Sequence, residues 1–273
     1  MTFRAAVLGS PISHSLSPVL HNAGYKAAGL SGWEYTRIEC TAEALPETVE
    51  GAGEDYRGFS VTMPAKFAAL DFADEVTERA RAIGSANTLV RTGADTWRAD
   101  NTDCEGLLIA LDELMRGQQI TSAVVVGGGG TARPALWALR SLGVEHVTVL
   151  NRSDRSAELA SLTEGMDVAF APLDARTDIA GLTMAADAVI STVPSAGVAD
   201  HVNDLAHAPI LDVIYNPWPT PLAVRAASHG YHAVGGLSML AGQSYSQFEQ
   251  FTSVDAPREA MRAALFTHVA AQR

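Results

Sequence analysis

Residues 124–152 constrain this chain more than any other stretch, because they have the pattern of a strand, a glycine-rich turn, a helix and a second strand. Residues 123–126, Ala-Val-Val-Val, suit a short buried parallel strand. Four consecutive glycines follow, and leucines then recur at helical spacing up to Gly143, which suits a helix C-cap. The second strand is predicted at residues 147–150, so the stretch predicts a parallel β-α-β unit.

The glycine-rich turn matches the pattern G-x-G-x-x-A. Glycines in this pattern let the backbone bend tightly and approach a pyrophosphate at the N-terminus of the following helix. The motif is weak by itself, since a run of glycines also suits a flexible loop, but the flanking strand and helix favour a dinucleotide site. The candidate cofactor-binding residues of the turn are Gly127, Gly128, Gly129, Gly130 and Thr131.

The residues after the second strand bear on which dinucleotide binds. A site for NAD usually has an acidic residue here, which binds the ribose 2′-hydroxyl. This chain has Asn151, Arg152 and Ser153 instead, with Arg155 close behind, and arginine suits the 2′-phosphate of NADP. Two alternatives stay open: the arginines are solvated surface side chains, or Asp154 serves NAD.

Composition limits the class of protein. A chain of 273 residues with 47% hydrophobic content has room for two domains. A net charge of −12 argues against nucleic acid or an anionic membrane as a partner and favours an enzyme with local sites for anionic small molecules. No apolar run suits a membrane span or a signal peptide, and two cysteines suggest neither a disulfide framework nor a metal site. We therefore expect a cytoplasmic protein without a bound metal.

Two serines lie at the start of the first predicted helix. Residues 5–9 predict a strand, after which Ser17 is an N-cap by residue type and Pro18 occupies the first helical position. Ser15 and Ser17 are two residues apart, so in an extended segment both hydroxyls can point toward a helix N-terminus that could hold a carboxylate. A polar turn with a capping serine is the alternative.

A lysine and an aspartate lie near the starts of two further predicted helices. Lys66 follows a strand at residues 58–62 and lies in the first helical turn, where the helix dipole disfavours a cation. Such a lysine is either a tolerated surface residue or an amine able to exchange protons near neutral pH. Thr102 and Glu105 have capping-box spacing, so Asp103 is either a favourable first-turn acid or a functional carboxylate.

The last motif is a strand that leads into a helix near residue 236. On this helix Met239, Gln243 and Gln247 are spaced i, i+4 and i+8 and share one face. That face either borders a cleft or is partly exposed. Together, the repeated strand and helix patterns predict a parallel sheet covered on both faces.

Four local patterns, taken together, resemble the shikimate dehydrogenase family across nearly the whole chain. They are Ser-His-Ser-Leu-Ser-Pro at 13–18, Ser-Val-Thr-Met-Pro-Ala-Lys at 60–66, Ala-Asp-Asn-Thr-Asp at 99–103, and Gly-Leu-Ser-Met-Leu at 236–240 with Gln243. The resemblance implies an α/β protein with an N-terminal substrate-binding and catalytic domain at 1–103 and a Rossmann-type NADP domain at 104–237. C-terminal helices at 238–273 would return to the substrate domain, and a cleft between the two domains would hold both ligands.

The resemblance also implies an activity and a role for each matching residue. The activity is the reversible NADPH-dependent reduction of 3-dehydroshikimate to shikimate in aromatic amino-acid biosynthesis, with Lys66 and Asp103 as the catalytic pair. The substrate-binding residues would be Ser15, Ser17, Thr62, Lys66, Asn87, Asp103, Tyr215 and Gln243. Besides the glycine turn and Asn151, Arg152, Ser153 and Arg155, the cofactor would contact Glu78, Val213, Gly236 and Met239.

The chain departs from the family pattern in a few places. Ser60 replaces the asparagine that most members carry, and Gly128 and Thr131 vary a loop that is usually richer in alanine. Neither change removes a charge that the chemistry needs. An NAD-dependent quinate/shikimate dehydrogenase and a catalytically silent dinucleotide-binding regulator remain alternatives, and the sequence leaves a homodimer open.

Overall fold

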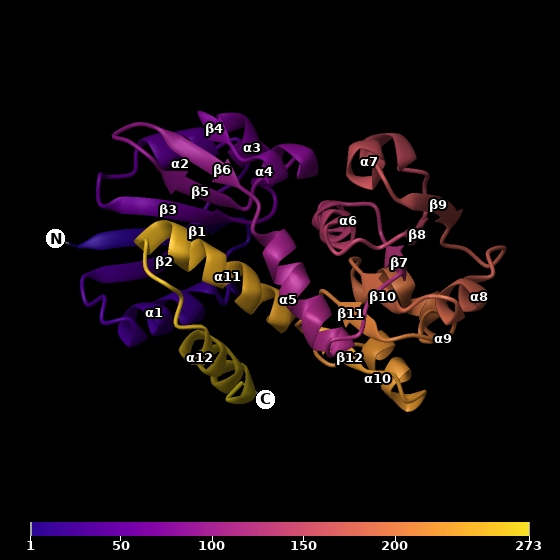
Figure 1. Ribbon diagram of the computed structural model, residues 1–273. Helices are drawn as coiled ribbons and strands as arrows, with labels where there is room; N and C mark the ends of the chain where they lie inside the picture. Colours follow the sequence, from indigo (N-terminus) through magenta and orange to yellow (C-terminus); the bar gives the residue numbers. More distant parts are fainter. Residues whose placement is uncertain (1, 273) are drawn as a thin grey trace. The chain divides into compact units, whose positions relative to one another are not determined.

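The computed structural model describes residues 2–272 and divides into two compact units (Figure 1). Unit 1 comprises Met1–Asp103 and Leu240–Arg273, and unit 2 comprises Cys104–Met239. The boundary therefore lies slightly beyond the expected residue 237. Within residues 2–272, each unit contains one six-stranded sheet.

Unit 1 has a mixed sheet with strand order β2-β1-β3-β5-β6-β4. Strand β1 is parallel to β2 and β3, whereas β5 is antiparallel to both β3 and β6. A turn near Gly93 joins β5 to β6, and the core on one face includes Phe59, Leu89 and Trp97. The elements are β1 (Phe3–Gly9), α1 (Ser17–Ala27), β2 (Trp33–Glu39), α2 (Leu45–Glu50), β3 (Tyr56–Val61), α3 (Lys66–Phe72), β4 (Glu75–Val76), α4 (Glu78–Ile83), β5 (Thr88–Arg91) and β6 (Trp97–Asp100).

Unit 2 has an all-parallel sheet with strand order β12-β11-β10-β7-β8-β9. The chain runs from central β7 out to β9, then returns to β10 on the other side of β7, which is the order of dinucleotide-binding sheets. The elements are α5 (Asp103–Met115), β7 (Ser122–Val126), α6 (Ala132–Ser141), β8 (His146–Asn151), α7 (Ser156–Thr163), β9 (Asp167–Pro172), α8 (Ile179–Met184), β10 (Ala188–Ser191), η1 (Ser195–His201), α9 (Val202–Leu205), β11 (Ile210–Asp212), α10 (Pro221–Ser228) and β12 (Ala233–Gly235).

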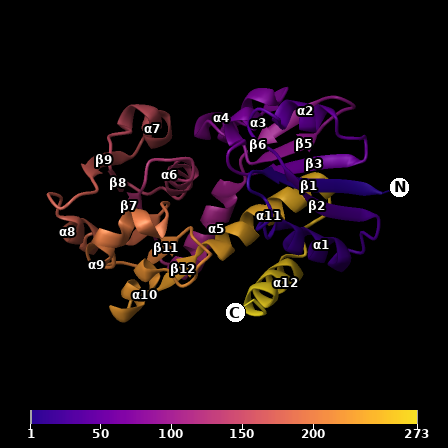
Figure 2. The same cartoon turned by 180° about the vertical axis from the view of Figure 1, so that it is seen from behind.

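Helices cover both faces of the unit 2 sheet, as the sequence predicts. Figure 2 shows α6 and α7 on one side of the strands and α8, α9 and α10 on the other. On the second side, Ile179, Leu205 and Leu222 pack against Val124 and other sheet residues in one buried cluster. The expected α/β fold class with a Rossmann-type unit is confirmed.

The C-terminal helices α11 (Gly236–Thr252) and α12 (Arg258–Ala270) complete unit 1. Glycines permit the close packing: a Cβ atom at Gly58 on β3 would overlap the ring of Phe251 on α11. At Gly24 on α1, a Cβ atom would lie 2.9 Å from Phe248 and 3.0 Å from Met261. Helices α1, α11 and α12 therefore meet where one of them has no side chain.

The N-cap predicted at Ser17 is wrong. Helix α1 begins at Ser17 itself, and Leu16 occupies the cap position without a side-chain cap hydrogen bond. The hydroxyl of Ser17 instead accepts a hydrogen bond from the side chain of Ser15. Ser17 therefore uses its hydroxyl in a contact with another side chain and not as the N-cap, the position that serine often takes.

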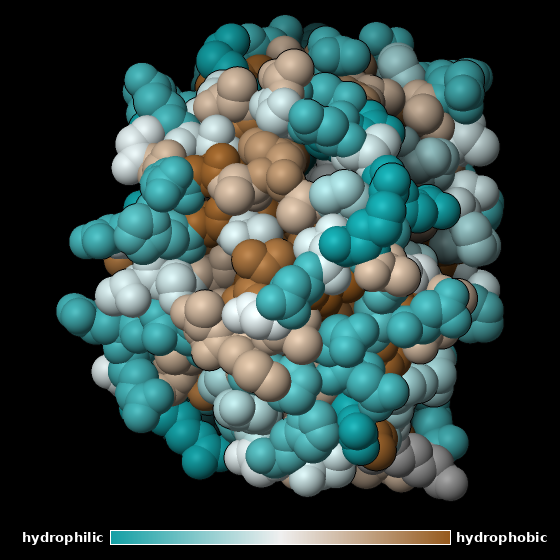
Figure 3. Space-filling view, turned by 90° about the vertical axis from the view of Figure 1, so that its right-hand side faces the viewer, coloured by the Kyte–Doolittle hydropathy of each residue, from teal (hydrophilic) through white to brown (hydrophobic). Residues whose placement is uncertain are grey.

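Among the described residues, no helix combines the length and the apolar character needed to cross a bilayer. Figure 3 shows one face of the molecule, on which hydrophilic side chains surround a smaller group of hydrophobic ones.

Asp100 at the end of β6 links three parts of unit 1. Its buried carboxylate accepts hydrogen bonds from Arg79 (2.6 and 2.5 Å), from Thr77 (2.7 Å) and from Gln250 on α11 (2.8 Å). Burial opposes ionisation of Asp100, but these hydrogen bonds and the charge of Arg79 hold its pKa below the ordinary value. The ionised form is therefore the one that stabilises the fold.

This carboxylate predicts a loss of stability in acid. Because its folded-state pKa is depressed, the stability contributed by Asp100 is present above its unfolded pKa, about 3.9, and is lost as the pH falls through the folded value. We expect the free energy of unfolding of the wild type, measured in urea from pH 7 to pH 3, to decrease more steeply below about pH 4 than that of Asp100→Asn. Parallel curves for the two proteins would contradict this role.

Candidate active site

Lys66 and Asp103 form an ion pair inside unit 1. Lys66 is the first residue of α3 and Asp103 is the first residue of α5. Lys66 Nζ lies 2.5 Å from Asp103 Oδ2, with the lysine side chain 24% exposed and that of the aspartate 4% exposed. The carboxylate offsets the unfavourable position of the cation at a helix N-terminus and holds a partly accessible ammonium group in place.

Asn87 orients this pair. Its Nδ2 donates to Asp103 Oδ1 (2.9 Å) and to Gln243 Oε1 (2.7 Å). Its Oδ1 accepts from the backbone N–H of Thr102 (2.7 Å) and from the hydroxyl of Thr88 (2.8 Å), so the orientation of the amide is determined. The structure thus brings together Lys66, Asn87, Asp103 and Gln243, which the sequence places far apart.

The two candidate carboxylate-binding serines lie at the N-terminus of α1. Ser15 Oγ lies 3.3 Å from Ser17 Oγ and also accepts a 3.4 Å hydrogen bond from the backbone N–H of Ser17. The guanidinium of Arg37 donates to the backbone oxygen of Ser15 at 2.9 and 2.5 Å. Arg37 is a contributor that sequence analysis missed, because no local pattern links a residue of β2 to this turn.

The remaining candidates are divided between the units. Thr62 follows β3 and donates its backbone N–H to Leu8 at 2.8 Å, in unit 1. Tyr215 lies in unit 2, unlike the other substrate candidates, and burial raises the pKa of its hydroxyl. Glu78 is exposed on α4 of unit 1, whereas the other cofactor candidates belong to unit 2.

Two of those unit 2 candidates meet at the start of α11. A Cβ atom at Gly236 would overlap the backbone oxygen of Val213, so the chain after β11 passes directly against this glycine. Met239 is buried one turn further along the helix. A side chain larger than glycine at 236 would displace the segment that carries Val213.

The glycine turn of unit 2 fits a phosphate. Gly127 has a φ of +112°, and a Cβ atom there would overlap Thr192 and lie 2.8 Å from Val193. Glycine is therefore required at this position. At Gly129 and Gly130 a Cβ atom would meet nothing within 4 Å, so space remains open before the N-terminus of α6. Such a helix terminus with free space in front of it suits an anionic group.

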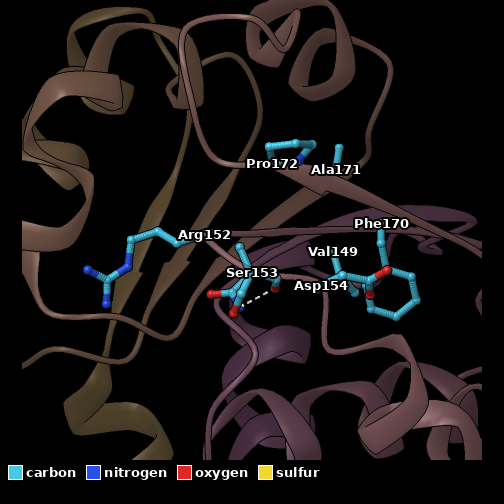
Figure 4. Close-up of a pocket in the computed structure, with 8 residues that line it drawn as sticks. Val149, Arg152, Ser153, Asp154, Phe170, Ala171 and Pro172 are labelled. Carbon is cyan, nitrogen blue, oxygen red and sulfur yellow. Dashed lines mark hydrogen bonds between the residues drawn. The ribbon is translucent and has the colours of Figure 1, made fainter.

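A cavity of about 200 Å³ lies at the carboxyl ends of β8 and β9. Figure 4 shows the side chain of Arg152 extending away from the other labelled residues of its lining. Arg155 is paired with Glu158 at 2.7 Å, and Asp154 accepts from the backbone N–H of Ser156 at 2.7 Å. Within residues 2–272 the guanidinium of Arg152 has neither a hydrogen bond nor an ion pair, so it is the arginine available to an anionic ligand.

Comparison with known proteins identifies the family. The shikimate dehydrogenase substrate-binding domain matches residues 7–89, and the shikimate 5′-dehydrogenase C-terminal domain matches residues 236–266. The shikimate dehydrogenase (NADP(+)) of Desulfitobacterium hafniense is 35% identical over 274 aligned residues, which cover 97% of this chain and 98% of that protein. The chain belongs to the shikimate dehydrogenase family.

Solved structures agree with this membership. The shikimate dehydrogenase of Mycobacterium tuberculosis is 48% identical, with a TM-score of 0.91 over 97% of this chain and 99% of that one. The quinate dehydrogenase of Corynebacterium glutamicum, solved with NAD, is 26% identical with a TM-score of 0.85, over 97% and 99% of the two chains. The expected family and the expected class, an NADP-dependent oxidoreductase, are confirmed.

Proposed function

We propose that this shikimate dehydrogenase family member reduces the ketone of 3-dehydroshikimate to the alcohol of shikimate, reversibly and with NADPH, and that Lys66 and Asp103 carry the proton chemistry. The observation behind these roles is the 2.5 Å contact between Lys66 Nζ and Asp103 Oδ2. Asn87 holds the second carboxylate oxygen and also contacts Gln243. The proposed proton donor Lys66 and the groups that orient it therefore lie together in unit 1.

Each residue has a defined task in this reaction. NADPH, when bound, supplies the hydride that reduces the carbonyl carbon. Lys66 donates a proton from Nζ to the developing alkoxide oxygen, a contribution of typically about 10²–10⁴-fold. Asp103 accepts the hydrogen bond from Lys66, which orients the amine until the proton is transferred. In the direction of oxidation, Lys66 accepts the hydroxyl proton in return.

The other candidates would hold the substrate. Ser15 and Ser17 at the N-terminus of α1 would bind its carboxylate, because hydroxyl donors and a helix N-terminus both favour an anion. Thr62, Asn87, Gln243 and Tyr215 would bind the ring and its hydroxyls. The contact between Asn87 and Gln243 supports this assignment for the two amides.

The glycine turn would hold the pyrophosphate, and Arg152 would bind the 2′-phosphate of NADP. We expect Arg152→Ala to raise the KM for NADP by about tenfold or more while the KM for NAD changes little, because only NADP carries the 2′-phosphate and a charge-assisted hydrogen bond contributes roughly 1.5–3 kcal/mol. Steady-state kinetics with both cofactors measures the effect. Arg140→Ala is the matched control, since this exposed arginine of unit 2 pairs with Glu164 and is not a cofactor candidate. An equal loss for both cofactors in Arg152→Ala would remove the assignment.

A kinetic comparison of two cofactors and two substrates tests the function. Rates with NADP and NAD, each combined with shikimate and quinate, should give the highest kcat/KM for NADP with shikimate. A preference for NAD with quinate would instead support a quinate dehydrogenase. Binding of NADP without turnover of either acid would support a regulatory dinucleotide-binding protein.

We also propose a cytoplasmic location and a homodimer. The biosynthetic relatives support the location, and cell fractionation tests it. Sedimentation velocity tests the oligomeric state, because the monomer mass is 28.7 kDa and a dimer would have twice this mass.

A further inference from the structure

Three buried side chains from three different elements of unit 1 form a hydrogen-bonded chain. Tyr35 on β2 donates from its hydroxyl to Ser60 Oγ on β3 at 2.6 Å. Ser60 donates in turn to Gln247 Oε1 on α11 at 2.8 Å. The exposed fractions of Tyr35, Ser60 and Gln247 are 2%, 5% and 2%. Hydrogen bonds in such a dry environment are stronger than in water, and losing one partner leaves the others unsatisfied.

One end of this chain reaches the candidate carboxylate-binding serines. Burial raises the pKa of Tyr35, and the side chain of Ser17 lies close enough to the Tyr35 hydroxyl to lower it in part. Ser15 Oγ in turn donates to Ser17 Oγ at 3.3 Å. Tyr35 therefore contacts one of the two hydroxyls that would bind the carboxylate.

The other end reaches the amide that orients the catalytic pair. Gln247 Nε2 donates to Thr88 Oγ1 at 3.1 Å and to the backbone oxygen of Asn87 at 3.2 Å. Thr88 donates to Asn87 Oδ1 at 2.8 Å, and Asn87 Nδ2 donates to Asp103 Oδ1 at 2.9 Å. From Tyr35 to Asp103, each side chain therefore donates a hydrogen bond to the next, an arrangement in which neighbouring hydrogen bonds polarise and strengthen one another.

His21 on α1 holds the tyrosine of this chain in position. Its ring is fully buried and stacks on the ring of Tyr35, with the centroids 4.1 Å apart and the planes inclined by 6°. Burial lowers the pKa of His21 to about 3, although the adjacent Gln247 side chain raises it in part. The imidazole is therefore neutral near pH 7 and packs on Tyr35 without adding a charge.

We propose that Tyr35, Ser60 and Gln247 are positioning residues, which fix the carboxylate-binding serines relative to the Lys66–Asp103 pair. The inference rests on the proposed function. A substrate held at its carboxylate by Ser15 and Ser17 presents its ketone to Lys66 only if both ends of the site keep their relative positions. Misplacement by about 1 Å can cost on the order of a hundredfold in rate, so a rigid connection between the two ends has kinetic value.

Tyr35→Phe tests the proposal because it removes the hydroxyl and keeps the ring. We expect kcat/KM for 3-dehydroshikimate to fall about tenfold, as the 2.6 Å hydrogen bond to Ser60 and the contact with Ser17 are lost, and the KM for NADPH to stay within about twofold of the wild type. Tyr25→Phe is the matched control. Tyr25 is also 2% exposed and lies in the same aromatic cluster as His21, but its hydroxyl has no hydrogen-bond partner among the described residues.

A substrate analogue separates positioning from a general loss of structure. If Tyr35 acts through Ser17 on the carboxylate, an analogue of 3-dehydroshikimate with hydrogen in place of the carboxylate should react equally well with wild type and Tyr35→Phe. Ser60→Ala interrupts the same chain, and the loss in the double variant should be less than additive. If Tyr35→Phe does not fold, Ser60→Ala carries the same comparison.

Two results would overturn the proposal. One is Tyr35→Phe kinetics equal to those of Tyr25→Phe, and the other is an equal loss with and without the substrate carboxylate. A wild-type protein that does not reduce 3-dehydroshikimate would defeat the proposed function itself. An active wild type with an unaffected Tyr35→Phe would defeat only the positioning role.

Discussion

Lys66→Ala should lower kcat for 3-dehydroshikimate reduction by at least about a hundredfold, while the Kd for NADPH stays near the wild-type value. The reason is that a general acid acts only in the transition state, so its loss appears in kcat rather than in cofactor binding. Steady-state rates and a fluorescence titration with NADPH measure the two quantities.

If Lys66 is only a surface lysine without a catalytic role, the opposite result is expected. A solvated lysine at a helix N-terminus could be replaced by alanine without loss of turnover, and the fold could even gain stability. The chain contains only two lysines, so Lys26→Ala on the exposed side of α1 is a natural control and should leave kcat unchanged. A Lys66→Ala enzyme within a few-fold of the wild type would end the proposed mechanism.

Asp103→Asn should cause a loss of similar size, on the order of a hundredfold in kcat. The substitution keeps the shape of the side chain but removes the negative charge that holds the ammonium of Lys66 at 2.5 Å. The double variant should lose much less than the product of the two single effects, because the residues act as one unit.

The control for Asp103 lies on the same helix. Asp112→Asn removes an exposed carboxylate from α5 and should leave kcat unaltered. Strictly multiplicative losses in the Lys66→Ala, Asp103→Asn double variant would show that the two residues act independently, which the observed ion pair does not support.

Much of the fold could be predicted from local patterns. The β-α-β unit around the glycine turn was predictable because alternation, helical spacing and glycine act over a few residues, and Gly127 indeed has a φ of +112°. Gly143 likewise has a φ of +74°, although the C-cap residue of α6 is Leu142 and Gly143 follows it, where a left-handed glycine often ends a helix. Local preference failed at Ser17, where the expected N-cap is missing.

The sequence suggested which residues belong to the candidate site, but not which of them contact one another. Helical spacing placed Gln247 on the same face as Gln243, yet nothing local indicated that Gln247 is buried against Ser60, 187 residues earlier in the chain. Similarly, the sequence did not distinguish Arg152 from Arg155 as the candidate for the 2′-phosphate. Only the structure shows that Glu158 forms an ion pair with Arg155.

The sequence by itself determined which residue types stand at the helix starts, the turns and the buried strands, because these depend on backbone conformation and on periodicity over a few neighbours. Tertiary structure alone decided that Lys66 meets Asp103 across 37 residues and that Asn87 joins them to Gln243 across 156. The physical reason is that hydrogen bonds and ion pairs act over a few ångströms, and only the folding of unit 1 brings Lys66 on α3, Asn87, Asp103 and Gln243 on α11 within that range.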